Sequence, residues 1–384
     1  MSTPDLTPAI DAAVAHYRAL LESQLARAEA LNAPEQPKDF AHLDHIRLGI
    51  IGGDGIGPII VNQSRRVLEV LLAPEIASGR IELVDIPGLT LENRMACGQA
   101  VPPEVLEQIK SCDVFLKGPT TTPKGGTMGS ANVALRKELD LYIDLRPVAI
   151  PALGVDWAFF RENTEGEYML GSDGIEVPGL LAMDFKVTTD AGTRRIAKAA
   201  FDYAVRNNKT RVDIVTKANI MKKTDGKFSR ICHEVAAEYP DIEVEEWYID
   251  IMTANLVNPA RQKDFQVILL PNLYGDIITD EAAQLQGGVG TAGAANVGDR
   301  YAMFEAIHGS APRMIERGMG DYANPASILR AAVMLLEHIG HMDEAARLTA
   351  ALNALDADPT KVITGRPDGL TAAAYIDALL SLLN

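Results

Sequence analysis

The chain has 384 residues, of which 47% are hydrophobic and 23% are charged, and its formal net charge at pH 7 is −16. This composition is typical of a soluble globular protein with one large or two ordinary domains. The acidic charge argues against a nucleic-acid partner, because neutralising phosphates takes clustered lysine and arginine. No apolar stretch is long enough to span a membrane. The three cysteines follow no disulfide or zinc spacing, and the N-terminal residues resemble neither a signal nor a transit peptide, so the cytoplasm is the predicted location.

The first 45 residues form a segment of their own. Apolar side chains recur at helical spacing from Pro8 to Leu31, and Pro34 and Pro37 then interrupt the pattern. We expect a helical arm that packs on the body of the protein or on another subunit. No chemistry is assigned to it.

From residue 46 onward, strand-like apolar runs alternate with helical segments, which predicts an α/β fold with a mainly parallel sheet. The first strand, 46–51, leads through a glycine-rich turn at 53–57 into a helix at 59–72. That turn misses the G-x-G-x-x-G spacing of a dinucleotide-binding turn, so we interpret it as a tight turn that packs a helix on a strand. Later strands are predicted at 81–85, 114–116, 157–161, 211–216, 243–248 and 266–270, and later helices at 193–207, 230–239 and 325–339.

Two aspartates carry the strongest chemical signal. Asp276 and Asp280 follow the apolar run 267–270 and lie four residues apart, so their carboxylates share one face of a helix. Hard oxygen ligands of this kind suit Mg²⁺ or Mn²⁺. An acidic, solvated helix start gives the same pattern.

Arginines, a lysine and a tyrosine accompany the two aspartates. Arg136, Arg146 and Arg161 together would suit a substrate with several carboxylates, because guanidinium groups bind carboxylates through two hydrogen bonds. Each arginine taken alone is better explained by a surface salt bridge, although Arg146 and Arg161 lie beside strand-like apolar runs. Lys217 ends an apolar strand, where burial would lower its pKa toward that of a base, unless its side chain reaches out to water. Tyr168 follows a polar turn and suits either a general acid or the edge of the core.

Taken in order, these motifs resemble the isocitrate/isopropylmalate dehydrogenase family of metal-dependent β-decarboxylating dehydrogenases, and most of all isocitrate dehydrogenase. The resemblance covers nearly all of the chain after the arm. It implies a two-domain α/β fold that is not a Rossmann fold. A discontinuous large cofactor-binding domain would comprise 46–141 and 287–384, and a smaller domain at 142–286 would hold the dimer interface. The motifs are GDGIGP, KGPTTTP, SANVALR, DLRP, RENTEGEY, TKANIMKKTDG, NLYGDIITDEAAQ and EAIHGSAP.

The resemblance also implies a reaction, namely the oxidative decarboxylation of isocitrate to 2-oxoglutarate and CO₂ with reduction of NAD or NADP. Asp276 and Asp280 would hold Mg²⁺ or Mn²⁺ together with Asp250 of the partner subunit in a homodimer or higher homo-oligomer with shared active sites. Lys217, also across the interface, would be the base and Tyr168 the acid. The tricarboxylate substrate would contact Ser130, Asn132, Arg136, Arg146 and Arg161. The cofactor would contact Pro119, Thr121, Thr122, Asn219, Glu305, His308, Gly309, Ser310, Ala311, Arg313 and Asn324.

Three alternatives stay open at this point. The polar side chains of Ser130 and Asn132 favour isocitrate over isopropylmalate, while homoisocitrate differs from isocitrate by only one methylene. Arg313 stands where NAD-specific relatives have an acidic residue, which favours NADP, but Met314 does not match the NADP pattern. A non-catalytic regulatory subunit of a heteromeric isocitrate dehydrogenase would share most of these motifs.

Overall fold

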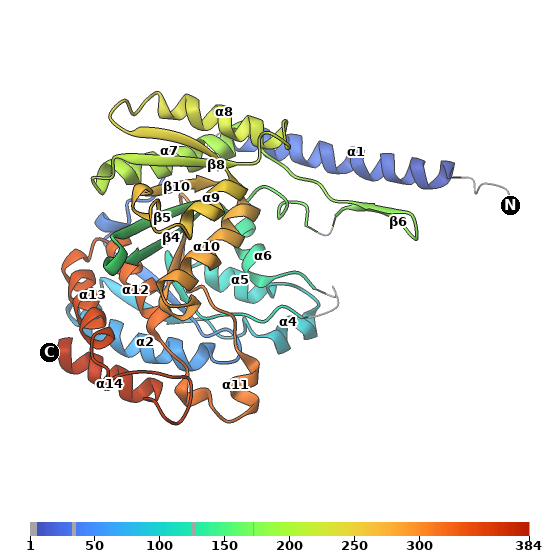
Figure 1. Ribbon diagram of the computed structural model, residues 1–384. Coiled ribbons are helices and arrows are strands. Elements are labelled where there is room, and N and C mark those ends of the chain that lie inside the picture. The colour runs from blue at the N-terminus through green and yellow to red at the C-terminus, as the bar shows by residue number, and fades with distance from the viewer. Residues whose placement is uncertain (1–5, 33–35, 124–127, 172, 384) are drawn as a thin grey trace. The chain divides into compact units, whose positions relative to one another are not determined.

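The computed structural model describes residues 6–32, 36–123, 128–171 and 173–383 (Figure 1). The chain divides into two compact units. The smaller unit comprises 1–36 and 160–278, and the larger one comprises 37–159 and 279–384. Strand β5 (Val155–Glu162) and helix α10 (Asn272–Gln286) each begin in one unit and end in the other.

The larger unit is built on a mixed sheet. In this sheet β1 pairs in parallel with β2 and β3, β3 pairs in parallel with β12, and β11 runs antiparallel to both β12 and β4. The spatial order of the strands is β2 (Ile81–Asp85), β1 (Ile46–Ile51), β3 (Val114–Lys117), β12 (Ala302–Ala306), β11 (Gly293–Val297) and β4 (Ile143–Ile150).

Helices cover both faces of this sheet. Along β3 the side chains alternate: Val114 and Leu116 join one buried cluster and Phe115 joins another, as the two-residue period of a strand requires. The first cluster includes residues of α2 (Gly57–Leu71), α12 (Ala326–His338), α13 (Met342–Asp356) and α14 (Ala372–Leu383), and the second those of α5 (Pro103–Lys110) and α6 (Ala131–Glu138). The remaining helices of this unit are α3 (Ala73–Ser78), α4 (Leu91–Cys97) and α11 (Pro312–Glu316).

In the smaller unit three parallel strands lie in the order β10 (Val267–Leu270), β8 (Arg211–Thr216) and β9 (Glu243–Tyr248). Helix α7 (Asp190–Arg206) packs on β8, β10 and α8 (Thr224–Ala236), and α9 (Ile249–Leu256) follows β9. Helix α1 (Thr7–Ala30) lies beside a separate hairpin of β6 (Ile175–Val177) and β7 (Leu181–Met183) (Figure 1). Across the chain, short 3-10 helices lie at Phe40–His42, Pro151–Leu153, Gln262–Asp264, Val289–Thr291 and Gly320–Tyr322.

The predicted α/β class, the N-terminal helix and the predicted strands are confirmed. Strands β4, β6, β7, β11 and β12 were not predicted. The antiparallel strand β11 was missed because its sequence GAANV lacks the β-branched and aromatic residues that favour strands. Small residues are needed there, since a Cβ on Gly293 would lie 2.4 Å from the backbone nitrogen of Ala331 in α12. Residues 33–35, on which the predicted end of the arm falls, lie outside the described residues, and the predicted domain boundaries stay predictions.

Within the described ranges, none of the helices is both long and apolar enough to cross a membrane.

The glycine-rich turn packs closely against a distant segment of the larger unit. Gly55 has a φ of +57°, and the amide of Ile56 donates to the carbonyl oxygen of Ser310 at 3.0 Å. A Cβ on Gly55 would lie 2.0 Å from that same oxygen. The turn therefore brings the GDGIGP and EAIHGSAP motifs together, which agrees with its interpretation as a packing turn.

We expect Gly55→Ala to lower stability by about 2 kcal/mol or more, because it combines backbone strain with a clash that neither backbone can relieve. Gly79→Ala is the matched control: its φ is +78°, but no atom lies within 4 Å of the added Cβ. The control isolates the strain of about 1 kcal/mol. Thermal unfolding of both variants measures the difference, and equal losses would contradict the close approach.

Candidate functional site

The first turn of α10 is bound to the end of β5 through Arg161, whose side chain is fully buried. Arg161 donates from Nη1 to Oδ1 of Asp276 at 2.5 Å, and from Nε and Nη2 to Oδ1 of Asn272 at 3.0 and 2.6 Å. This approach requires the glycine of the NLYGD motif, because a Cβ on Gly275 would lie 2.5 Å from Cγ of Arg161. The motif thus places a carboxylate and an amide oxygen on one guanidinium group.

Tyr168 completes this group. Its hydroxyl donates to the other oxygen of Asp276, Oδ2, at 2.7 Å, and its ring centroid lies 5.4 Å from the guanidinium carbon of Arg161. We call Arg161, Tyr168, Asn272 and Asp276 the Arg161 cluster. It unites a substrate-binding, an acid and a metal-binding candidate from two separate motifs, RENTEGEY and NLYGDIITDEAAQ, and it adds Asn272, whose role the sequence did not suggest.

Lys217 lies in the turn after β8, where its ammonium is 2.5 Å from Oδ1 of Asp250 at the start of α9. Both side chains are partly exposed, at 27% and 58%, so Lys217 is less buried than its strand-end position suggested. The direct hydrogen bond from Lys217 holds the pKa of Asp250 below its ordinary value. These two predicted residues therefore lie together.

Buried Asp225 fixes the position of Lys217. Its carboxylate accepts the backbone amide of Lys217 at 2.8 Å and the hydroxyl of Tyr274 at 2.9 Å, and it pairs with the ammonium of buried Lys186 at 2.6 Å. Burial and the charge of Asp225 raise the pKa of Tyr274 above its ordinary range. Sequence reasoning missed Asp225 and Lys186. Only the position of Asp225 inside the TKANIMKKTDG motif pointed to it.

In the larger unit, Arg146 on β4 is the counter-ion of Asp280. Its Nη1 lies 3.5 Å from Oδ1 of Asp280 and donates to Thr279 at 2.7 Å, while Nε donates to both oxygens of Asp144 at 3.1 and 3.2 Å. The Asp280 side chain is 62% exposed, whereas that of Arg146 is 8% exposed. Each of the two aspartates of α10 is thus paired with an arginine.

Arg136 and Glu305, predicted to serve substrate and cofactor respectively, bind each other. Oε1 of Glu305 accepts from Arg136 at 3.2 Å and from Asn296 at 2.9 Å, and Oε2 accepts from Lys117 at 3.0 Å. Burial acts to raise the pKa of Glu305, but the charges of Lys117 and Arg136 outweigh it and hold the pKa below its ordinary value. Nε of Arg136 is buried without a hydrogen-bond partner in the described part of the chain, which leaves a donor for a ligand.

The predicted cofactor contacts at 119–122 and 308–311 meet in the larger unit. The hydroxyls of Thr121 and Ser310 are 2.6 Å apart, and Asp54 binds the turn by accepting the amide of Thr121 and donating its own amide to Pro119, both at 2.8 Å. Nε2 of His308 is buried without a partner among the described residues, and burial lowers its pKa. The site thus offers a neutral imidazole to a ligand.

Arg94 supports the same turn and was missed by the sequence analysis. It is fully buried and donates to the carbonyl oxygens of Ala100 and Thr121, each at 2.8 Å, and of Gly129 at 3.2 Å. Burial lowers the pKa of its guanidinium. No local pattern distinguishes this arginine from a surface one.

The other predicted site residues have simpler surroundings. In the larger unit Ser130 precedes α6 as its N-cap residue, and Asn132 accepts the hydroxyl of Thr120 at 3.0 Å. Asn324 accepts the amide of Ala326 at 2.9 Å at the start of α12. Exposed positions are occupied by Thr122, Gly309 and Arg313 in the larger unit and by Asn219 in the smaller one.

The donor set of α10 fits a divalent cation only in part. Asp276 and Asp280 offer hard oxygens with exposed fractions of 42% and 62%. In the described part of the chain no three His, Cys, Asp or Glu side chains form a metal-binding group, and Asp250 lies with Lys217 instead. These two aspartates would supply two ligands, and the remaining ligands would come from substrate, water or a second chain.

A family model for isocitrate/isopropylmalate dehydrogenase matches residues 47–366. The chain belongs to this family. The predicted family and its α/β fold are confirmed, and helix α1 precedes the matched region.

Known members of the isocitrate/isopropylmalate dehydrogenase family resemble the chain closely. Isocitrate dehydrogenase [NADP] of Rickettsia felis is 41% identical over 310 residues, which cover 78% of this chain and 61% of that protein. The chain thus spans about 61% of the length of this relative. A mitochondrial protein of Dictyostelium discoideum, named as a regulatory subunit of isocitrate dehydrogenase [NAD], is 38% identical over 343 residues, which cover 87% and 91%. The crystal structure of isocitrate dehydrogenase from Methylococcus capsulatus matches with a TM-score of 0.78 and 35% identity, over 88% of this chain and 99% of that one.

The family motif RENTEGEY contains a buried pair of carboxyl groups. Glu162 accepts the amide and hydroxyl of Thr164 at 2.9 and 2.7 Å and the amide of Glu165 at 2.6 Å. Burial and the nearby carboxylate of Glu165 nevertheless raise the pKa of Glu162 from its ordinary value of 4.5 to about 7. Between about pH 4.5 and pH 7, the folded chain therefore keeps a proton on Glu162 that the unfolded chain releases.

This shift predicts how stability depends on pH. The stability from Glu162 is fully present below about pH 4.5 and is lost as the pH rises toward about 7, because the unfolded chain binds fewer protons in that window. Glu162→Gln cannot ionise, so its stability relative to the wild type should improve across this window. A difference in stability between the variant and the wild type that is the same at every pH would reflect only the changed hydrogen bonds of the variant. Thermal unfolding from pH 4 to 8 measures the slope, and a pH-independent difference would contradict the raised pKa.

Proposed function

We propose that the chain catalyses the oxidative decarboxylation of isocitrate to 2-oxoglutarate and CO₂, with reduction of NAD or NADP and with Mg²⁺ or Mn²⁺ bound. The observation that carries this proposal is the Arg161 cluster, in which a guanidinium and a phenol from one family motif meet a carboxylate from another at 2.5 to 2.7 Å. The names of the relatives from Rickettsia felis and Methylococcus capsulatus support the same reaction.

The residues of the chain match the needs of this chemistry. Asp276 and Asp280 would hold the cation, which as a Lewis acid would polarise the substrate's hydroxyl and the adjacent carboxylate. Arg136, Arg146 and Arg161 would bind the substrate's carboxylates. Lys217 would accept the hydroxyl proton as a neutral amine, after its ammonium has given up a proton. The phenol of Tyr168, directed into the Arg161 cluster by its bond to Asp276, would deliver a proton to carbon after CO₂ leaves.

The predicted substrate and cofactor follow from polar residues in the larger unit. Ser130 and Asn132 could bind a third carboxylate, and an isopropyl group in their place would leave polar groups unpaired. This favours isocitrate over isopropylmalate, with homoisocitrate as the nearer alternative. Arg313 is exposed on α11, where a guanidinium suits the 2′-phosphate of NADP, so NADP is favoured over NAD.

The proposed enzyme is a homodimer with shared active sites. The pair formed by Lys217 and Asp250 is partly exposed, and neighbouring positions carry exposed apolar side chains, with Ile220 at 66%, Tyr248 at 42% and Ile251 at 48%. Apolar residues around a charged functional pair favour a surface that a partner covers. We infer that Lys217 and Asp250 act in the site of the partner. The cytoplasm stays the predicted location.

The similarity to the Dictyostelium discoideum regulatory protein makes a non-catalytic subunit the second candidate. Such a subunit needs neither metal ligands nor an acid and a base. This chain has Tyr168, Lys217, Asp250, Asp276 and Asp280. Their presence favours catalysis.

We expect the purified chain with Mn²⁺ to reduce NADP with isocitrate. Its kcat/KM should exceed that for homoisocitrate or isopropylmalate by about tenfold or more, which corresponds to about 1.4 kcal/mol at the transition state. The rate with NAD should be lower, and a chelator should stop the reaction. Initial rates for the three acids with both cofactors provide the measurement.

Two tyrosine variants control this experiment. Tyr168→Phe should lower kcat by about 10² to 10⁴, the usual contribution of a general acid. Tyr239→Phe loses a hydroxyl that donates to Asp202 at 2.6 Å and should keep its activity. If the wild type reduces neither cofactor with any of the three acids, the catalytic proposal fails and a regulatory role becomes the better interpretation.

Shared sites predict complementation between two inactive variants. Lys217→Met and Asp276→Asn should each be inactive alone. In a mixed dimer, one site would combine the intact Asp276 of one chain with the intact Lys217 of the other, so refolding or co-expressing both variants should restore activity. Up to about a quarter of the wild-type rate follows if chains pair at random. Assembly states are checked by light scattering, and a mixture that stays inactive although mixed dimers form would refute the shared site.

A further inference from the structure

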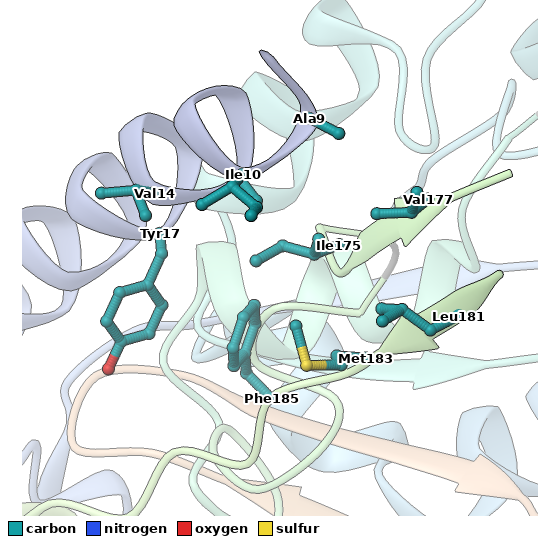
Figure 2. Close-up of a pocket in the computed structure, with 10 residues that line it drawn as sticks. Ala9, Ile10, Val14, Tyr17, Ile175, Val177, Leu181, Met183 and Phe185 are labelled. Carbon is teal, nitrogen blue, oxygen red and sulfur yellow. The ribbon is translucent and has the colours of Figure 1, made fainter. Parts of the chain in front are cut away.

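Helix α1 lies before the region that the family model matches, yet it is held on the smaller unit at several points. Its apolar stripe and the β6–β7 hairpin enclose a groove of about 370 Å³, in which Ile10 and Tyr17 face Ile175, Met183 and Phe185 (Figure 2). The rings of Tyr17 and Phe185 are 5.4 Å apart between centroids. Nε2 of His16 lies 2.9 Å from the carbonyl oxygen of Asp173.

The last turn of α1 carries an arginine that forms a salt bridge with a buried carboxylate. Nη1 of Arg27 donates to Oε1 of Glu165 at 3.0 Å, and the side chains of the two residues are 21% and 3% exposed. Glu165 also accepts the hydroxyl of Thr189 at 2.6 Å and its amide at 2.8 Å. A buried carboxylate that loses its counter-ion is strongly destabilised, so the backbone of Glu165 would move to bring the charge closer to water.

Glu165 is connected to the Arg161 cluster through its own backbone. Its carbonyl oxygen accepts from Nδ2 of Asn272 at 3.1 Å, and the other end of that amide, Oδ1, accepts two hydrogen bonds from Arg161. Asn272 is 1% exposed, so water cannot readily replace either partner. A movement of Glu165 would therefore turn the amide that holds Arg161 and, through Arg161, would displace Asp276 and Tyr168.

We propose that Arg27 is a positioning residue of the active site: by binding Glu165 it fixes the 162–166 turn and thereby sets the orientation of Arg161, Asp276 and Tyr168. This proposal rests on the proposed function of the Arg161 cluster. It gives the N-terminal arm a role in catalysis without contact between the arm and the substrate. Displacements of about 1 Å in such a group can change rates by about 10².

The test compares substitutions at two arginines of α1. Arg27→Ala should raise the KM for isocitrate and lower kcat/KM by about tenfold, because Arg161 binds substrate. The KM for NADP should stay unchanged, since the predicted cofactor contacts other than Asn219 lie in the larger unit. Arg18→Ala removes the same charge from an exposed position on the same helix and should leave all constants unchanged. Arg27→Lys keeps the cation and should recover most of the loss.

Hydrogen exchange separates this proposal from the proposed function. The amide of Glu165 donates to Glu162, and that of Gly166 donates to Val187 at 2.8 Å. In Arg27→Ala both amides should exchange at least about fivefold faster than in the wild type or Arg18→Ala. If the wild type lacks activity but these amides exchange faster in Arg27→Ala, the proposed reaction is wrong, while the proposal that Arg27 fixes the 162–166 turn is supported. If Arg27→Ala only lowers the melting temperature, with exchange and the KM for isocitrate unchanged, the positioning role is refuted.

Discussion

Two carboxylates four residues apart on α10 repel each other, and the structure provides a separate guanidinium for each. Arg161 binds Asp276 at 2.5 Å, and Arg146 lies 3.5 Å from Asp280. Both arginines are almost fully buried, so they need a negative partner even more than the partly exposed aspartates need a positive one. Binding of a cation and a polycarboxylate would satisfy both needs at once, because the cation would take the aspartates while the substrate's carboxylates take the arginines. The observed pairing and the proposed binding mode are therefore two arrangements of the same charges.

Buried acids also bind several cations and backbone groups around the candidate residues. Glu305 binds Lys117 and Arg136, and Asp225 binds Lys186 and the backbone of Lys217. In each case the carboxylate accepts several hydrogen bonds, which offsets its removal from water. In our proposal these buried acids do not contact the substrate. They restrict the movement of the side chains that do contact it. The precision of the site therefore depends on acids that look, in the sequence, like ordinary charged residues.

The features that could be predicted from the sequence are those set by the spacing of residues close together in the chain. The strands rich in β-branched residues, the helical stripe of α1 and the shared face of Asp276 and Asp280 all follow from periodicity. The sequence could not predict pairings between distant positions: Arg27 and Glu165 are 138 residues apart, and Arg94 binds carbonyl oxygens up to 35 residues away. It also missed β11, where close packing against α12 selects glycine and alanine over residues that favour strands.

The arm shows why distant pairing matters for function. Helix α1 has no buried residue, and a helix of this kind gains little stability from its own hydrogen bonds in water. Its order must come from what it contacts, namely the hairpin groove along its first half and Glu165 at its end. Glu165, in turn, belongs to a motif of the family, whereas α1 lies before the matched region. A segment outside the shared fold is therefore attached to the site through one buried carboxylate, and this arrangement would let the arm adjust a site whose reacting groups stay the same.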